Sequence, residues 1–71
     1  MIKEVKRKDR NGNVRTVELL LDGSEYVGAI RGGAPVKMMS GNFLRPVVAT
    51  GSGLSIDAAV MATMVEFEGR N

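Results

Sequence analysis

Residues 2–21 read IKEVKRKDRNGNVRTVELLL and carry the strongest fold signal in the chain. At its centre, Asn11-Gly12 supplies the positive φ angles that a tight turn between antiparallel strands requires. After the turn, Val17, Leu19 and Leu21 fall on one face at the two-residue period of a half-buried strand. The sequence therefore predicts a β-hairpin. Its first arm, residues 2–8, is less regular and is expected at a sheet edge.

The residues that follow predict that the sheet continues. Asp22-Gly23-Ser24 is a turn signal. In residues 25–31, Tyr26, Gly28 and Ile30 share one face, which favours a third antiparallel strand over the alternative of a short helix.

A break at residues 32–35, Gly-Gly-Ala-Pro, separates this strand from the next elements. Residues 36–39 and 43–49 flank Ser40-Gly41-Asn42 and predict a second hairpin. Pro46 lacks an amide donor, so its arm is expected at an edge or with a bulge.

The C-terminal segment predicts a helix that begins after Ser55. The Ser55 hydroxyl is well placed as an N-cap, and the Asp57 charge complements the helix dipole. Two apolar stripes follow at helical spacing: Ile56, Val60, Thr63, Met64 and Phe67 form the first, and Leu54, Ala58, Met61 and Val65 form the second. Gly69 can end the helix. Residues 65–68 also alternate, so a shorter helix followed by a terminal strand is the alternative.

Together these elements predict a single α+β domain over residues 1–71. We expect an antiparallel meander of four to five short strands, with a small barrel as one possible closure, and one C-terminal helix. Folding of so short a chain removes only about 60 % of its unfolded surface. The chain has no cysteine and no histidine, so a disulfide or the usual zinc ligands cannot supplement the core. Self-association is therefore expected.

The composition argues against catalysis. Without histidine, the serines and threonines lack the usual general base. The carboxylates show no calcium-loop spacing. We therefore expect no enzyme activity, no cofactor and no metal site.

The charge is concentrated at one end of the chain. Residues 1–15 carry a net charge of +4 and residues 16–71 carry −2. A cation cluster on an extended ribbon can neutralise nucleic-acid phosphates, although charges on an edge strand also prevent unwanted pairing. The candidate nucleic-acid-binding residues are Lys3, Lys6, Arg7, Lys8, Arg10 and Arg15.

Glycines that precede the helix form a second candidate site. The free amides of a helix N-terminus can bind an anion, such as the phosphate of a nucleotide. The alternative, a plain connection from strand to helix, is favoured because no Walker motif is present. The candidate anion-binding residues are Gly51, Ser52, Gly53 and Ser55.

The apolar helix is the third candidate. Its two stripes exceed what one thin sheet can cover, and its methionines, like Met38 and Met39, adapt to varied surfaces. The candidate oligomer-interface residues are Ile56, Val60, Met61, Met64, Val65 and Phe67.

Two short windows resemble known families. Leu21-Asp22-Gly23 with Tyr26, Gly28 and Ile30 resembles the strand-turn-strand of Sm-like RNA-binding proteins. Residues 48–55 resemble the strand-to-helix junction of Alba-like nucleic-acid-binding proteins. Each window covers only some ten residues or fewer, and neither assigns a family.

The leading hypothesis is a homo-oligomeric, non-catalytic protein that contacts nucleic-acid backbones through the basic hairpin. The alternative is a protein-interaction or assembly subunit, such as a small viral or plasmid-encoded structural or inhibitory protein. It would act through its strand edges and its methionine-rich helix. Residues 1–15 contain no signal-peptide-like apolar run, so a cytoplasmic location without membrane contact is expected.

Overall fold

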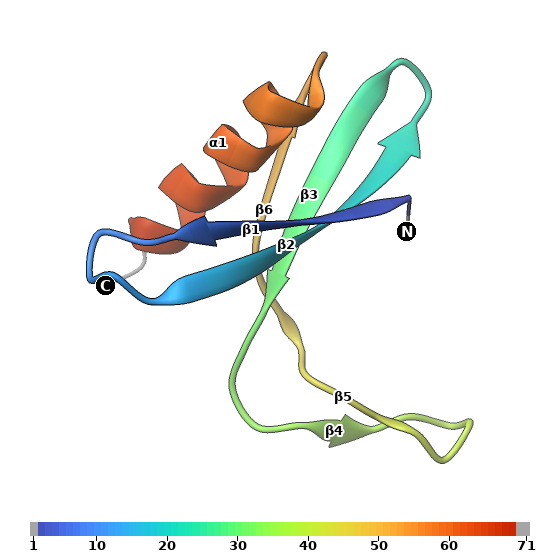
Figure 1. Ribbon diagram of the computed structural model, residues 1–71. Helices are drawn as coiled ribbons and strands as arrows, with labels where there is room; N and C mark the ends of the chain where they lie inside the picture. The colour runs from blue at the N-terminus through green and yellow to red at the C-terminus, as the bar shows by residue number, and fades with distance from the viewer. Residues whose placement is uncertain (1, 70–71) are drawn as a thin grey trace.

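The computed structural model of the chain describes residues 2–69 (Figure 1). Four strands form an antiparallel sheet in the order β1-β2-β3-β6, and two short strands, β4 and β5, form a separate ribbon. The expected α+β class with one C-terminal helix is confirmed. The bounds are β1 Lys3–Lys8, β2 Val14–Asp22, β3 Glu25–Arg31, β4 Val36–Lys37, β5 Phe43–Leu44, β6 Val47–Gly53 and α1 Ile56–Glu68.

The first hairpin is confirmed, and Asp9 stabilises its turn. Its carboxylate oxygen Oδ1 accepts hydrogen bonds from the amides of Asn11 and Asn13, each at 2.9 Å. Gly12 has a φ of 84°, but Asn11 does not adopt the positive φ expected for a two-residue turn. The connection is instead a loop over residues 9–13, closed by the Asp9 amide donating to the Asn13 carbonyl at 2.8 Å. The register then pairs Val5 with Val17 and Lys3 with Leu19, so β1 is an edge strand as expected.

The second predicted hairpin is shorter than expected, because residues 47–53 do not pair with residues 36–39. They return as β6 to pair with β3, and only Val36–Lys37 and Phe43–Leu44 pair in the ribbon. The register shifts between Ile30 and Arg31, where the ribbon leaves the sheet. Pro46, which has no amide donor, lies at this junction.

Helix α1 lies on one face of the four-stranded sheet (Figure 1). It begins where expected, with the Ser55 Oγ accepting from the Ala58 amide at 3.1 Å. It continues to Glu68, so residues 65–68 are helical and the terminal-strand alternative is wrong. Gly51 permits this packing, since a Cβ there would collide with the Thr63 nitrogen.

The core lies between α1 and this sheet face. It consists of Val17, Leu19, Ile30, Ala49, Ala59, Val60 and Met64. Within residues 2–69, β1 and β6 form the two edges, so the sheet does not close into a barrel. We call the opposite sheet face, which α1 does not cover, the open face.

Candidate functional site

The six basic residues of the hairpin do not form one surface. Successive strand residues point to opposite faces, and Val5 packs against the core on the helix side. The alternation therefore assigns Lys3 and Arg7 to the helix side and Lys6 to the open face. Lys8, at the end of β1, lines the groove between β1 and α1.

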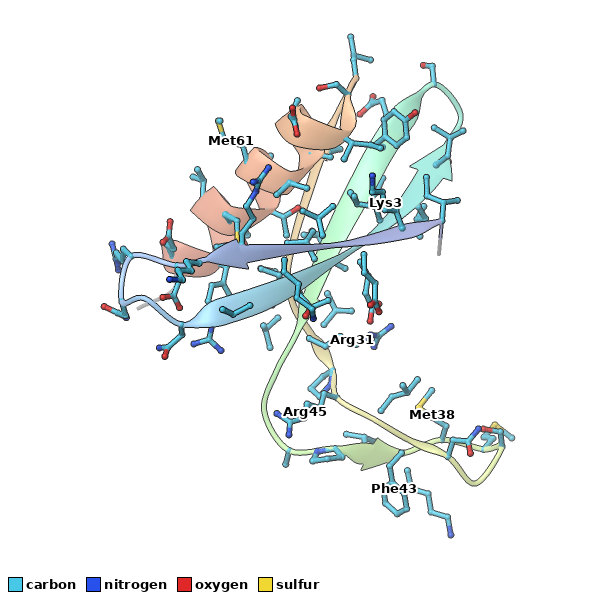
Figure 2. The ribbon with its side chains drawn as sticks, in the orientation of Figure 1. Lys3, Arg31, Met38, Phe43, Arg45 and Met61 are labelled. Atoms are coloured by element: carbon cyan, nitrogen blue, oxygen red, sulfur yellow. The ribbon has the colours of Figure 1, made fainter. Side chains whose placement is uncertain are left out.

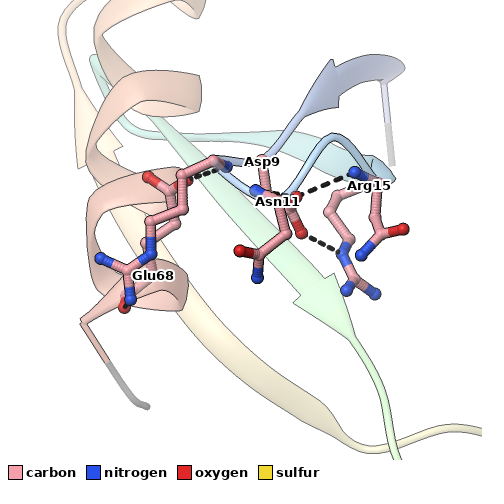
Figure 3. Close-up of polar contacts among 6 residues, drawn as sticks. Asp9, Asn11, Arg15 and Glu68 are labelled. Carbon is pink, nitrogen blue, oxygen red and sulfur yellow. Dashed lines mark hydrogen bonds and ion pairs between the residues drawn. The ribbon is translucent and has the colours of Figure 1, made fainter.

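The arginines of the hairpin contact acidic residues of the same chain. Arg7 lies 3.6 Å from the Asp57 carboxylate at the start of α1. The Arg10 amide donates to the Glu68 Oε2 at 2.7 Å, and its guanidinium donates to the Glu68 carbonyl at 2.9 Å. Figure 3 shows how the contact with Glu68 joins the turn to the end of α1.

Asp9 and Arg15 form the most protected ion pair. The Arg15 Nε donates to Asp9 Oδ2 at 3.0 Å (Figure 3), and the Asp9 side chain is only 3 % exposed. The Arg15 guanidinium lies 4.9 Å from the centre of the Phe67 ring. Burial raises the Asp9 pKa, but the Arg15 and amide hydrogen bonds and the Arg15 charge outweigh it, leaving the pKa below its ordinary value. The three arginines are thus engaged within the fold.

The lysines are the remaining cations of the hairpin. Lys6 donates to the Thr16 hydroxyl at 3.0 Å. Within residues 2–69, no ion pair involves Lys3, Lys6 or Lys8. These three side chains are all exposed, so they are the cations of the predicted nucleic-acid site that pair with no acidic group among the described residues.

The predicted anion-binding glycines lie in a strand rather than in a loop. Gly51, Ser52 and Gly53 are the last residues of β6. A Cβ on Gly53 would lie 2.7 Å from the Ala58 Cβ, so this glycine allows α1 to approach the strand. Ser55 caps the helix. The strand therefore continues to Gly53 instead of ending at Ala49 as expected, because strand pairing and helix packing take up these residues.

The predicted helix interface divides into core and surface. Val60 and Met64 are buried, and Ile56 and Phe67 pack against the core. Met61 and Val65, at 68 % and 66 % exposure, face solvent. The first apolar stripe therefore serves folding, whereas the second, formed by Leu54, Ala58, Met61 and Val65, is exposed along its whole length.

A projecting ribbon is the feature that the sequence reasoning missed. Residues 32–46, here called the arm, extend away from the four-stranded sheet (Figure 1). Its base is held by a hydrogen bond from the Gly32 amide to the Pro46 carbonyl at 3.0 Å and one from Arg31 to the Arg45 carbonyl at 2.9 Å. The arm exposes the large apolar side chains Val36, Met38, Met39, Phe43 and Leu44. Its sequence signals are Gly32-Gly33 and Pro46 at the ends and Met38-Met39 near the tip.

Two grooves lie outside the core. One, of about 400 Å³, separates β1 from α1 and contains the Arg7–Asp57 pair. The other, of about 360 Å³, lies on the open face. It is lined by Glu18, Leu19, Leu20, Val27, Ala29, Arg31, Val47 and Thr50.

The described residues give no sign of a metal or a membrane span. Residues 2–69 hold no cluster of three or more potential metal ligands. No helix in this part of the chain has the length and apolar character needed to cross a bilayer. Comparisons of the chain with models of protein families, with curated proteins and with solved structures found no match.

Proposed function

We propose that this chain is a non-catalytic assembly subunit that associates with itself through the arm. The exposed apolar side chains of the arm are the observation that carries the proposal. Phe43 is 64 % exposed and Met39 is fully exposed, and both lie on an element that projects from the domain (Figure 2). Exposed apolar clusters of this kind are typical of protein-interaction sites.

The small size of the arm supports the same function. An isolated two-stranded ribbon is at best marginally stable in water. The strands β4 and β5 have only two residues each. Packing on a partner would remove apolar side chains from water, at about 25 cal/mol per Å² of buried surface. A partner therefore provides the stabilisation that the arm lacks in the single chain.

The composition of the arm is typical of a protein-binding surface rather than of a catalytic site. Residues 32–46 contain no acidic side chain, and their only charged residues are Lys37 and Arg45. Methionines such as Met38 and Met39 adapt their shape to a partner surface.

Sedimentation velocity over a range of protein concentrations tests this function. We expect dimers or larger species for the unaltered chain and monomers for a double variant, Met39→Ser with Phe43→Ser. Met61→Ser is the control, because Met61 is about as exposed as Phe43 but lies on α1. A chain that stays monomeric at every concentration, or a double variant that associates normally, would contradict the proposal.

Contact with nucleic-acid backbones is the second candidate function. The observation that favours it is that Lys3, Lys6 and Lys8 are exposed and form no ion pair among the described residues. It would rest on three cations instead of the six predicted, because the arginines contact acidic groups of the fold.

A further inference from the structure

The register of the sheet shows which backbone groups of β6 lie at its free edge. Hydrogen-bonded and non-hydrogen-bonded pairs alternate along antiparallel strands. The Asp9 amide donates to the Asn13 carbonyl, which sets this alternation for β1 and, through the registers of β2 and β3, for β6. Gly51 thus bonds to β3, whereas the amides and carbonyls of Thr50 and Ser52 point away from the sheet. Both of these residues are exposed.

The other edge strand, β1, carries charges that oppose pairing with a further strand. The same alternation directs the amides of Glu4, Lys6 and Lys8 outward. All residues of β1 except Val5 are charged, and lysines on an edge strand protect it from pairing. In contrast, β6 has the sequence VVATGSG, without a charged side chain. The edge of β6 is therefore the one at which another strand can pair.

The C-terminal part of β6 is complementary to itself. The register shift next to Ile30 lies before Ala49, so residues 49–53 form a regular segment. If two such segments run antiparallel about a twofold axis at Gly51, Thr50 of each copy lies opposite Ser52 of the other. The two residues of such a pair exchange both of their backbone hydrogen bonds. No like charges meet, and pairs of threonine with serine across two strands are favourable.

The position of the arm relative to this edge favours a second copy of the chain as the partner. The arm ends at Pro46, and β6 begins at the next residue. In the pairing about Gly51, Val48 of one copy lies opposite Leu54 of the other. The arm of each copy therefore leaves the sheet beside Leu54 of the other copy, a side chain that is 78 % exposed. Association through the arm and pairing of β6 thus fit within one dimer.

We propose that two copies pair through residues 49–53 of β6 and join their four-stranded sheets into one continuous sheet. This inference rests on the proposed self-association, in which the arm supplies the apolar contacts, and adds the strand that sets the geometry of the dimer. The strands at the two ends of the joined sheet are then the β1 strands, whose charges oppose further pairing. The contact is isologous and closed, so pairing through β6 ends at the dimer.

Disulfide trapping tests this register, because the natural chain has no cysteine. Two single variants, Thr50→Cys and Ser52→Cys, are prepared with tags of different mass, mixed and oxidised. Directly opposite residues of a hydrogen-bonded pair have Cα atoms about 5.5 Å apart, which a disulfide can bridge. The two copies of Thr50, or of Ser52, would be diagonal neighbours at roughly 7–8 Å, beyond the usual range of a disulfide.

We therefore expect the mixed dimer to form faster and in higher yield than either homodimer. The control mixture combines Thr50→Cys with Lys6→Cys, whose cysteine would lie on the opposite edge of the sheet. It should give little mixed product.

The outward amide of Ser52 provides the second measurement. Proline lacks this amide and is tolerated on an edge strand where the N–H faces solvent, so Ser52→Pro should keep its pairing with β3 and fold normally by circular dichroism. Each copy would lose one hydrogen-bond donor to the other. We expect the dimer dissociation constant in sedimentation velocity to rise by roughly tenfold or more. The matched control, Ser52→Ala, keeps the amide and should dimerise like the unaltered chain.

The outcomes separate this inference from the proposed function. If the arm variant loses association while Ser52→Pro dimerises as tightly as Ser52→Ala and the mixed crosslink does not exceed the control, the arms associate without β6 and the inference is wrong. If the crosslink forms and Ser52→Pro weakens the dimer while the arm variant associates normally, the pairing of β6 is supported and the proposed role of the arm fails. If the unaltered chain is monomeric at every concentration, both proposals fail.

Discussion

At the residue scale, Asp9 links the stability of the fold to pH. Its folded-state pKa lies below the ordinary value, so the ionised carboxylate favours the folded state. This contribution is fully present above about pH 4, the ordinary range of an aspartate, and is lost as the pH falls through the lower folded-state pKa.

We therefore expect Asp9→Asn to lower the urea midpoint at pH 7, because the amide cannot pair with Arg15. The variant should also show a weaker fall in stability between about pH 4 and pH 2. Urea unfolding of both proteins across this range measures the difference. If the stability of both proteins falls equally as the pH is lowered, Asp9 is not responsible for the pH dependence.

Gly51 is a residue at which the backbone of β6 packs tightly against the backbone of α1. A methyl group there would collide with the Thr63 nitrogen and would lie 2.6 Å from the Ala62 carbonyl carbon. We expect Gly51→Ala to lower the free energy of unfolding by about 1–3 kcal/mol, because α1 must move away from β6.

Gly41→Ala is the control for Gly51→Ala. Gly41 has a φ of 91°, and a methyl group added there would have no neighbouring atom within 4 Å. Gly41→Ala should therefore lower the free energy of unfolding only through backbone strain, by about 1 kcal/mol. Urea unfolding compares the two variants, and an equal or smaller loss at Gly51 would contradict the packing argument.

At the scale of the elements, the arm is separable from the domain. The Gly32 amide and Pro46 carbonyl are hydrogen-bonded at its base, so a two-residue Asn-Gly turn can replace residues 33–45. Core residues lie outside the replaced segment. We expect the shortened chain to keep its far-ultraviolet circular dichroism and unfold cooperatively, with a monomer stability within about 1 kcal/mol. Non-cooperative unfolding would show that the arm belongs to the folding unit.

The first hairpin prediction was confirmed, whereas the second hairpin is shorter than predicted, and the difference has a physical reason. In the first hairpin, Asp9 and Gly12 encode the turn locally, and the alternation of β2 sets its register. The second has local turn residues too, but residues 47–53 gain more by pairing with β3 and packing under α1. Such a long-range gain has no local signal in the sequence.

At the scale of the whole molecule, self-association should make thermal stability depend on concentration. A dimer that binds only folded chains raises the midpoint by mass action. We expect the thermal midpoint of the unaltered chain to rise with protein concentration and that of the Met39→Ser, Phe43→Ser variant to stay constant. Scanning calorimetry at several concentrations measures this, and a constant midpoint for both proteins would contradict dimerisation.

The distribution of charge predicts how salt would affect nucleic-acid binding. If Lys3, Lys6 and Lys8 make the phosphate contacts, the affinity should fall roughly 40-fold between 50 and 200 mM salt, from a slope of about −0.9 per contact. Fluorescence anisotropy with labelled duplex DNA and structured RNA measures it. A fall of about 10³-fold would instead require the arginines to leave their acidic partners.

The α+β class, the first hairpin, the third strand and the capped C-terminal helix could all be predicted from the amino-acid sequence. These follow from turn residues, periodicity and capping, which act over a few neighbouring residues. It also identified the basic residues of the hairpin and the surplus of apolar surface.

Only the tertiary structure decided which of these side chains remain available to a ligand. Arg7 and Arg10 contact residues of α1 that lie some fifty positions away in the chain. Val60 and Met64 enter the core, whereas Met39 and Phe43 remain exposed on the arm. Availability depends on which distant residues fold against each side chain, and the local pattern does not contain this information.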